Sequence, residues 1–329
     1  IMAEMDISEK RLPQDGRIQV KSCGRSVDLR VSTLPTIFGE KIVIRLLDKE
    51  NQILSLEHLG FRPVLMEKFR AMLAVPYGMI LITGPTGSGK TTTLYAALNE
   101  INDIGRNIVT VEDPVEYVLP GINQVQTNYK TGLDFAAGLR SILRQDPDVI
   151  MIGEIRDRET ATIAVRAATT GHLVFSTLHT NDAPGTITRL IDMGVEPFLV
   201  ASSVVGVMAQ RLVRRICSHC IEDYEIPPGA RERIYLGVTE DELLVLKRGR
   251  GCSACGFTGY KGRIAVHELL VLDSKARELI LKKASAEAIR EQVITDGMET
   301  LFQDGIEKVK SGITTVQEVL RVSFSEEAR

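Results

Sequence analysis

Polar and apolar residues alternate in short runs through the N-terminal part of the chain. The runs cover residues 17–20, 27–31 and 41–47 and are separated by Gly, Asp and Pro. A period of two places every second side chain on one face, as in a half-buried antiparallel strand. The pattern predicts a small β-rich domain over 1–50, with a linker at 49–59.

Longer apolar runs without alternation follow the linker. Residues 64–73 have helical periodicity, and 78–83 form an apolar run that leads directly into a glycine-rich segment. Further strand-like runs, each separated from the next by a stretch with helical pattern, lie at 107–111, 148–152 and 173–176. Strands that alternate with helices favour an α/β fold with a doubly wound, mostly parallel sheet. We expect this core to occupy 60–212.

The last third of the chain departs from this regular alternation. Residues 213–262 hold four of the five cysteines, and we expect them to form a subdomain of their own. A strand is predicted at 263–270, and the rest of 263–329 is predicted to be mainly helical. Its helical patterns lie at 275–282, 286–295 and 316–322.

Composition and charge limit the classes of protein to which the chain can belong. Its 329 residues, 44% of them hydrophobic, can bury two cores of ordinary size. Lys and Arg number 40 against 43 Asp and Glu, and the net charge of −3 gives no general attraction to nucleic acid or to an anionic membrane. No apolar run approaches the roughly 18 to 20 residues of a membrane span, and the N-terminus lacks the order of a signal peptide. We expect a cytoplasmic protein without a nucleic-acid partner, truncated ahead of Ile1.

The glycine-rich segment at 84–91 fits the pattern G-x-x-x-x-G-K-[ST]. Glycines let backbone N–H groups turn inward around phosphates, Lys90 reaches the β and γ oxygens, and the Thr91 hydroxyl can bind Mg²⁺. A chance glycine turn is the alternative, and the strand before and the helix after argue against it. The segment therefore predicts an ATP site. Its residues are Gly84, Pro85, Thr86, Gly87, Ser88, Gly89, Lys90 and Thr91, with Thr92 next to them.

Hydrolysis also needs carboxylates that hold the metal and orient water, and two acidic segments follow predicted strands. One holds Glu112, which we assign to nucleotide and Mg²⁺ binding, and Glu116; the other holds Glu154. Open α/β sheets place ligands at such strand ends, although a single acid there can equally be a helix cap. Two such segments beside one phosphate loop favour catalysis. His179 follows the strand at 173–176, where it can sense a γ-phosphate, although a lone histidine is more often structural.

The sequence also holds two C-x-x-C pairs outside the segments predicted to bind and hydrolyse ATP. They are Cys217 with Cys220 and Cys252 with Cys255. Four thiolates fit a tetrahedral structural Zn²⁺ site. Disulfides are the first alternative, disfavoured in a reducing compartment, and a redox C-x-x-C would leave the second pair unexplained. We expect zinc at this site. Cys23 is predicted to be an ordinary thiol.

These motifs together resemble the assembly ATPases of type II secretion and type IV pili, within the wider secretion ATPase superfamily. The resemblance covers nearly the whole chain and implies a RecA-like core that follows a small α+β (PAS-like) domain. The segments that carry it are the acidic box at 111–116, the Walker B region at 143–157, the histidine box at 170–180 and the leading segments 11–17 and 39–47.

The resemblance also implies roles for individual residues. Glu116 is similar to the general base that polarises the attacking water, Glu154 to the Walker B glutamate, and His179 to the histidine that reads the γ-phosphate. Arginines of the leading domain contact nucleotide phosphates in this family when the domain closes, and ordinary solvated strand charge is the alternative for each. The candidates are Arg17, Arg30 and Arg45.

A hexameric motor is the function that the resemblance implies. It would hydrolyse ATP on the cytoplasmic face of the bacterial inner membrane and drive a membrane platform that assembles a pseudopilus or pilus. Assembly members of the family commonly carry the four cysteines, whereas retraction members lack them. Two other classes stay open: a nucleic-acid translocase that grips with the cysteine module and its basic stretch 247–250, and a module that binds ATP without hydrolysing it.

Overall fold

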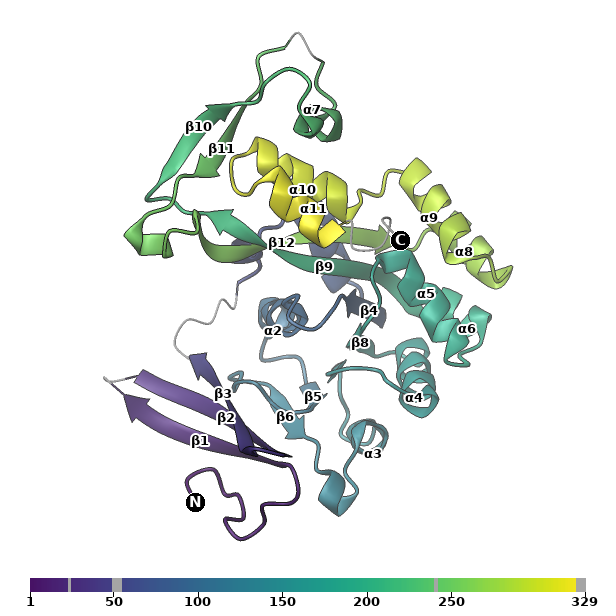
Figure 1. The fold of residues 1–329 in the computed structure, drawn as a ribbon. Coiled ribbons are helices and arrows are strands. Elements are labelled where there is room, and N and C mark those ends of the chain that lie inside the picture. Colours follow the sequence, from purple (N-terminus) through teal and green to yellow (C-terminus); the bar gives the residue numbers. More distant parts are fainter. Residues whose placement is uncertain (23–24, 49–54, 240–241, 324–329) are drawn as a thin grey trace. The chain divides into compact units, whose positions relative to one another are not determined.

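The computed structural model describes residues 1–22, 25–48, 55–239 and 242–323 (Figure 1). It divides into two compact units, Ile1–Ile53 and Leu54–Arg329. Cys23 and residues 49–54 of the predicted linker lie outside the described residues. None of the described helices is long and apolar enough to cross a membrane.

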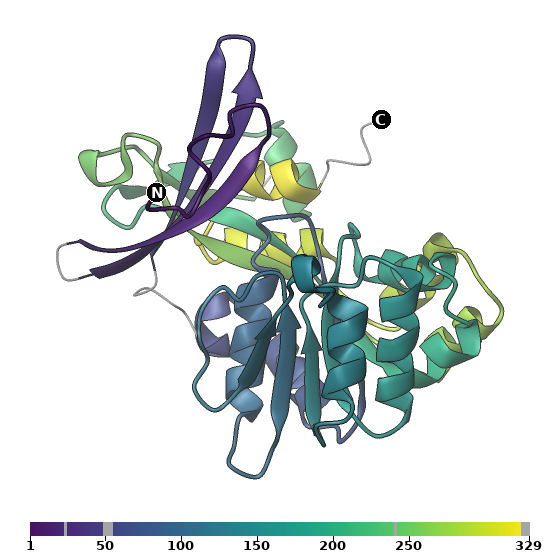
Figure 2. The same cartoon turned by 90° about the horizontal axis from the view of Figure 1, so that it is seen from below.

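The N-terminal unit is a three-stranded antiparallel sheet in the order β1-β2-β3, drawn in purple in Figure 2. Its strands are β1 (Gln14–Ser22), β2 (Arg25–Thr36) and β3 (Gly39–Asp48). The three predicted strands are confirmed, and each extends further than its alternating run. The described residues of this unit hold no helix, so the helical part of the α+β prediction has no counterpart in them.

The second unit is built on a seven-stranded sheet in the order β12-β9-β4-β8-β7-β5-β6. All neighbours are parallel except β12, which pairs antiparallel with β9, so the prediction of a mostly parallel sheet in an α/β fold is confirmed. The strands are β4 (Gly78–Thr83), β5 (Ile108–Glu112), β6 (Asn123–Gln126), β7 (Val149–Ile152), β8 (Leu173–Leu178), β9 (Val204–Ile216) and β12 (Tyr260–Val271).

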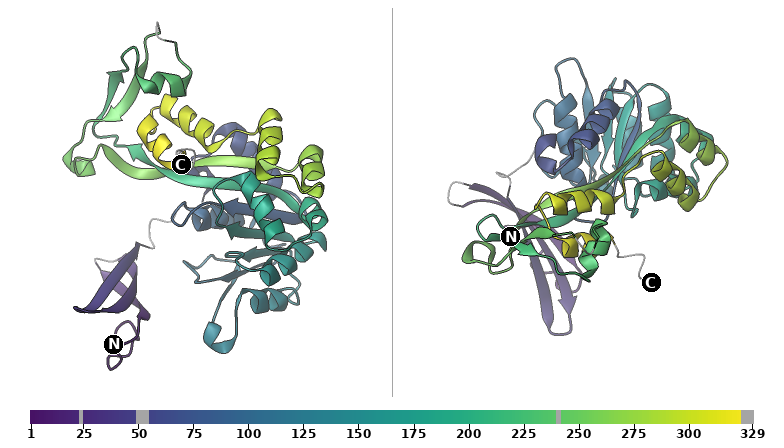
Figure 3. Two further views of the ribbon diagram at one scale, coloured as in Figure 1. Left: turned by 45° about the vertical axis from the view of Figure 1, so that its right-hand side comes forward. Right: turned by 90° about the horizontal axis from the view of Figure 1, so that it is seen from above.

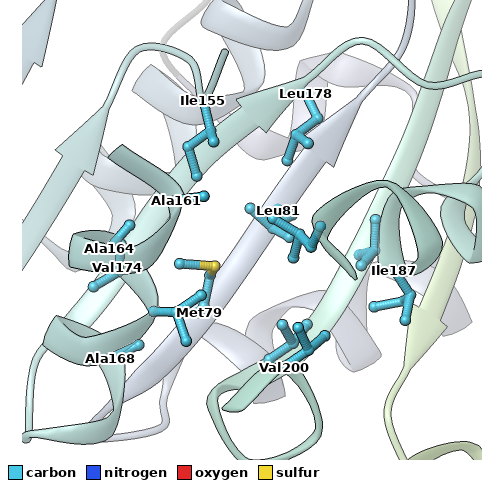
Figure 4. Close-up of a cluster of buried hydrophobic side chains, with 14 of the residues drawn as sticks. Met79, Leu81, Ile155, Ala161, Ala164, Ala168, Val174, Leu178, Ile187 and Val200 are labelled. Carbon is cyan, nitrogen blue, oxygen red and sulfur yellow. The ribbon is translucent and has the colours of Figure 1, made fainter. Parts of the chain in front are cut away.

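The central strands β4, β5, β7 and β8 are buried along their whole length. Helices cover both faces of the sheet, which explains why these strands are continuous apolar runs instead of alternating ones. Met79 and Leu81 of β4 face one layer, and Ile80 and Ile82 face the other. Figure 4 shows the first layer, in which the β4 side chains meet Ala161, Ala164 and Ala168 of α4, Ile187 of α5 and Val200 of α6.

The helices of the core begin where the sequence supplies a cap. Asp134, Asp157 and Asp182 each accept a hydrogen bond from a backbone N–H three residues on, which satisfies a donor that the helix itself leaves open. The core helices are η1 (Leu56–Leu59), α1 (Pro63–Leu73), α2 (Lys90–Ile101), η2 (Tyr129–Thr131), α3 (Phe135–Ile142), α4 (Arg158–Thr169), α5 (Ala183–Asp192) and α6 (Pro197–Ser203).

A separate hydrophobic cluster joins the cysteine-bearing region to the C-terminal helices. Leu236 and Leu246 pack with Val309 and Val319, which places the β10–β11 hairpin beside α10 and α11 (Figure 3). The elements are β10 (Ile221–Glu225), α7 (Arg231–Leu236), β11 (Val245–Gly249), η3 (Ser253–Cys255), α8 (Ser274–Leu281), α9 (Ala286–Thr295), α10 (Leu301–Lys310) and α11 (Val316–Ser323). The strand predicted at 263–270 is confirmed as β12, and the predicted helices are confirmed as α8, α9 and α11. Helix α10 was not predicted. The division of 60–329 into three subdomains stays a prediction.

Candidate functional site

The glycine-rich loop lies between the end of β4 and the start of α2, at the carboxyl edge of the sheet. Gly84, Gly87 and Gly89 have φ angles of +143°, +80° and +90°, which side chains other than glycine rarely adopt. A Cβ atom at Gly84 would lie 2.4 Å from the carbonyl oxygen of Gln210. The loop therefore keeps its shape because these positions are glycine.

Inside the loop, a buried lysine and a buried serine have polar groups suited to a bound anion. Lys90 Nζ donates to the carbonyl oxygens of Gly84 (2.7 Å) and Pro85 (3.2 Å), within its own loop. The Ser88 hydroxyl is buried, and no described group accepts from it or donates to it. Thr91 is exposed at the start of α2. These residues fit the phosphates of a nucleotide and an accompanying Mg²⁺ ion.

The second group of polar residues follows the neighbouring strands β7 and β8. Glu154 comes after β7 and is half-buried, and its Oε2 lies 3.1 Å from Nε2 of His179, which comes directly after β8. Arg156 pairs with the other oxygen of Glu154. Burial alone would raise the pKa of Glu154, but the hydrogen bonds from Arg156 and His179 hold it below its usual value. The structure thus brings Glu154 and His179 together as a hydrogen-bonded pair.

Threonines connect this pair to the glycine-rich loop. Thr83, the last residue of β4, accepts a hydrogen bond from the backbone N–H of Thr180 (2.9 Å), and the two hydroxyls lie 2.7 Å apart. Because Thr180 follows His179 in the chain, the histidine box and the start of the loop are held at one point of the sheet edge.

The two glutamates of the acidic box after β5, Glu112 and Glu116, lie in different environments. Glu112 is buried, and its carboxylate accepts hydrogen bonds from Tyr95, Thr110 and Gln124. Glu116 is half-buried, and its backbone N–H donates to the Tyr95 hydroxyl at 3.3 Å. The nucleotide and metal role assigned to Glu112 and the base role of Glu116 stay predictions.

Three arginines of the N-terminal unit, Arg17, Arg30 and Arg45, form a row across its sheet. Arg17 is the register partner of Arg30 on β2, and Arg30 is the register partner of Arg45 on β3. Directly opposed residues of antiparallel strands point to the same face, where like charges repel one another. The row concentrates guanidinium groups on one face, an arrangement suited to a polyanion such as a phosphate chain. Their contact with nucleotide stays a prediction.

The four cysteines of the two C-x-x-C pairs converge, with all their sulfur atoms within 4.8 Å of one another. The sulfur separations are 4.0 Å for Cys217 and Cys252, 3.9 Å for Cys220 and Cys255, and 3.8 Å for Cys252 and Cys255. Four sulfurs at about 2.3 Å from a tetrahedral zinc ion would lie about 3.8 Å apart. Backbone N–H groups of Cys252 and Gly259 lower the pKa of the Cys255 thiol to about 6. The cluster fits Zn²⁺.

Sequence reasoning missed two residues of β9 that lie against the site. Gln210 is buried, donates from Nε2 to the Ser88 carbonyl (2.8 Å) and accepts from the Thr93 hydroxyl (2.8 Å), so it contacts both the glycine-rich loop and the first turn of α2. Arg211 donates to the backbone and side-chain oxygens of Asn181, at 3.2 Å and 3.1 Å. Polar residues inside an apolar strand would have been the sequence signal.

Comparison with known proteins places the chain in a family. The model of the family described as "Type II/IV secretion system protein" matches residues 1–321. The chain belongs to this family. The resemblance that the sequence motifs indicated is therefore confirmed.

Individual relatives of this secretion-family chain are secretion and pilus proteins. The chain is 54% identical over 326 residues to "Type II secretion system protein E" of Pseudomonas aeruginosa, covering 99% of the chain and 64% of the relative. It is 53% identical over 320 residues to "Type IV pilus assembly ATPase PilB" of Thermus thermophilus, covering 97% and 36%. The chain therefore spans less than two thirds of the length of these relatives.

A solved structure supports the fold. The crystal structure of the pilus retraction motor PilT with bound ADP aligns with a TM-score of 0.70 at 28% identity, covering 97% of this chain and 80% of that one. The chain therefore has the fold of a protein crystallised with a nucleotide.

Nucleotide affinity is expected to fall as the pH rises above about 8. Burial, reinforced by Arg211 and opposed by Glu154, lowers the pKa of the Lys90 amine to about 8. A bound triphosphate favours the charged amine and raises its pKa, so binding takes up a proton between the two pKa values. The affinity then declines by up to about tenfold per pH unit. Calorimetry in buffers of different ionisation enthalpy measures the proton uptake.

The matched control for this pH dependence is Lys90→Arg, whose side chain stays charged. It should bind nucleotide with little change across the same pH range. If the wild-type protein instead bound with constant affinity from about pH 7 to about pH 9.5, the lysine would not be the titrating group.

Proposed function

We propose that this secretion-family chain is the ATP-hydrolysing part of a motor that assembles a pseudopilus or a pilus. The observation that carries the proposal is that the glycine-rich loop, the Glu154–His179 pair and the acidic box all follow parallel strands at the carboxyl edge of one sheet. Ligands of open α/β sheets bind at this edge.

Each residue has a distinct task in the proposed reaction. Bound ATP would supply the phosphoryl group that is transferred to water. Lys90 neutralises charge on the phosphates, and Thr91 holds the Mg²⁺ ion. Glu116 orients the attacking water and accepts its proton. Glu154 fixes the metal and the γ-phosphate, and His179, hydrogen-bonded to Glu154, responds to whether that phosphate is present.

The arginine row of the N-terminal unit would complete the site. Arg17, Arg30 and Arg45 share one sheet face, so a single approach of that face presents all three guanidinium groups. A permanently charged, planar cation stabilises the charge that develops in phosphoryl transfer. Movement of the N-terminal unit toward the nucleotide would then couple hydrolysis to mechanical work.

The names of the relatives, which refer to type II secretion and type IV pilus assembly, support a proposal for the partners. We infer a homo-hexamer that acts on a membrane platform protein and a cytoplasmic domain of the assembly machinery, at the cytoplasmic face of the inner membrane. Zn²⁺ would be a structural ion at the four cysteines, a feature that favours assembly over retraction.

The test of the motor proposal is the concentration dependence of ATP turnover. Specific activity should rise as subunits associate, because neighbouring subunits share each site, and light scattering in the same samples reports the oligomer. Constant specific activity from a protein that stays monomeric would contradict the ring. A large, salt-sensitive stimulation by single-stranded or duplex DNA would instead favour a nucleic-acid translocase.

A further inference from the structure

We propose that Tyr95 and Glu112 are positioning residues that tie the loop carrying Glu116 to the helix that begins at the nucleotide loop. The backbone of the acidic box would then be held against α2 instead of forming a free loop. The proposal rests on the assignment of Glu116 as the base in the proposed function, and it gives Glu112 a role different from binding Mg²⁺.

The carboxylate of Glu112 is hydrogen-bonded to three donors of the protein. Glu112 is 3% exposed, and each of its carboxylate oxygens accepts at least one hydrogen bond. Oε1 accepts from the Thr110 hydroxyl at 2.6 Å and from Nε2 of Gln124 at 3.1 Å, and Oε2 accepts from the Tyr95 hydroxyl. A buried carboxylate with three donors is stable in this place, because the hydrogen bonds offset the loss of water. A metal ion would have to displace them.

The Tyr95 hydroxyl bridges the strand and the loop. It donates to Glu112 and accepts from the backbone N–H of Glu116 at 3.3 Å, so both of its hydrogen-bonding functions are used. Burial, reinforced by the bond to Glu112, raises the pKa of Tyr95 far above its ordinary value, so the hydroxyl keeps its proton. The ring is fully buried and packs edge-on against Tyr117 at 4.5 Å. The hydroxyl is therefore held in one position.

Gln124 provides a second tie to the same loop. Its Nε2 donates to the Tyr117 carbonyl (3.1 Å) as well as to Glu112, and its Oε1 accepts from the Leu119 N–H (2.7 Å). The residues that follow Glu116 are thus fastened to β6, the neighbour of β5. Together the two ties hold the loop at the proposed base itself and at the residues that follow it.

Because Tyr95 lies on α2, its hydrogen bonds connect that helix to the backbone of Glu116. Lys90 begins that helix and Tyr95 lies about 7.5 Å further along its axis. A displacement of the glycine-rich loop that shifts α2 is therefore passed to the backbone of Glu116 through one hydroxyl. A misplacement of about 1 Å at a catalytic group can cost about a hundredfold in rate, so this tie matters for chemistry more than for binding.

Tyr95→Phe tests the tie, with Tyr117→Phe as the matched control. The first variant removes the bridging hydroxyl and keeps the ring; the second removes a hydroxyl that makes no hydrogen bond within the described part of the chain. We expect Tyr95→Phe to lower kcat by roughly 10- to 100-fold while KM and nucleotide affinity change by less than about twofold. Tyr117→Phe should keep the wild-type kcat. Melting temperatures and single-turnover rates per bound nucleotide separate this from simple loss of folded protein.

Glu112→Gln distinguishes positioning from metal binding. We expect the Mg²⁺ concentration at half-maximal turnover to stay near the wild-type value, with a lower kcat. A rise of roughly tenfold or more in that concentration would make Glu112 a metal-binding residue and overturn the proposal. If Tyr95→Phe is too unstable to assay, Gln124→Ala cuts the other tie and must show the same selective loss of kcat.

Failure of this inference and failure of the proposed function give different results. Normal kcat in Tyr95→Phe together with an inactive Glu116→Gln protein would contradict the tie alone. Normal kcat in Glu116→Gln would contradict the base itself, whatever Tyr95→Phe does.

Discussion

Glu116→Gln is expected to lower the kcat for ATP hydrolysis by about 10²- to 10⁴-fold, the range for losing a general base. The amide keeps the size and hydrogen-bonding reach of the side chain but cannot accept the proton of water. Binding should survive, because the shape of the proposed phosphate loop depends on Lys90 and on its glycines. Phosphate release under steady-state conditions and equilibrium binding of a fluorescent nucleotide measure the two effects separately.

Glu100→Gln is the control with the same chemical change. Glu100 lies on α2 and pairs with Arg70 (2.8 Å) at the protein surface, so its neutralisation should leave turnover near the wild-type rate. Retained hydrolysis in Glu116→Gln would remove Glu116 as the base and direct attention to Glu154. Loss of binding together with turnover would indicate a disturbed loop instead.

The parts of the site that the sequence could predict are those with a local pattern. The glycine-rich loop at 84–91 has fixed spacing between a strand and a helix, and β5, β7 and β8 are apolar runs bounded by polar residues. Each of these signals is contained in a short segment. The carboxyl ends of such strands meet at one edge of a parallel sheet, so the approximate position of Glu154 and His179 followed from the pattern.

Other parts depend on contacts between distant segments, and a local pattern alone does not predict them. Strand β9 (Val204–Ile216) follows α6 with no intervening glycine or proline, so its start could not be separated from the helix. Gln210 within that strand acquires its role only because β9 lies beside β4. The inward turn of Glu112 likewise depends on Tyr95 and Gln124, which belong to two other elements, so its sequence position at a strand end suggested a ligand instead.

Removal of zinc is expected to have the largest effect on stability. A structural zinc ion in small domains contributes about 10 to 16 kcal/mol of apparent binding free energy at neutral pH. Here it would join the end of β9, at Cys217, to the turn that holds Cys252 and Cys255. The cluster that packs the β10–β11 hairpin on α10 and α11 lies next to it along the chain. Cys255→Ser should therefore lose bound zinc and unfold at a markedly lower temperature, with the hairpin and C-terminal helices affected first.

Elemental analysis and hydrogen exchange test this expectation, with Cys23→Ser as the matched control. The wild type and Cys23→Ser should each carry about one zinc ion per chain, and a strong chelator should reproduce the Cys255→Ser exchange pattern in both. Because the strand that reaches Cys217 also carries Gln210 against Ser88, faster exchange is expected to extend along β9 toward the nucleotide loop. A Cys255→Ser protein with full zinc content, or one without zinc and with unchanged exchange in α10 and α11, would contradict a structural metal.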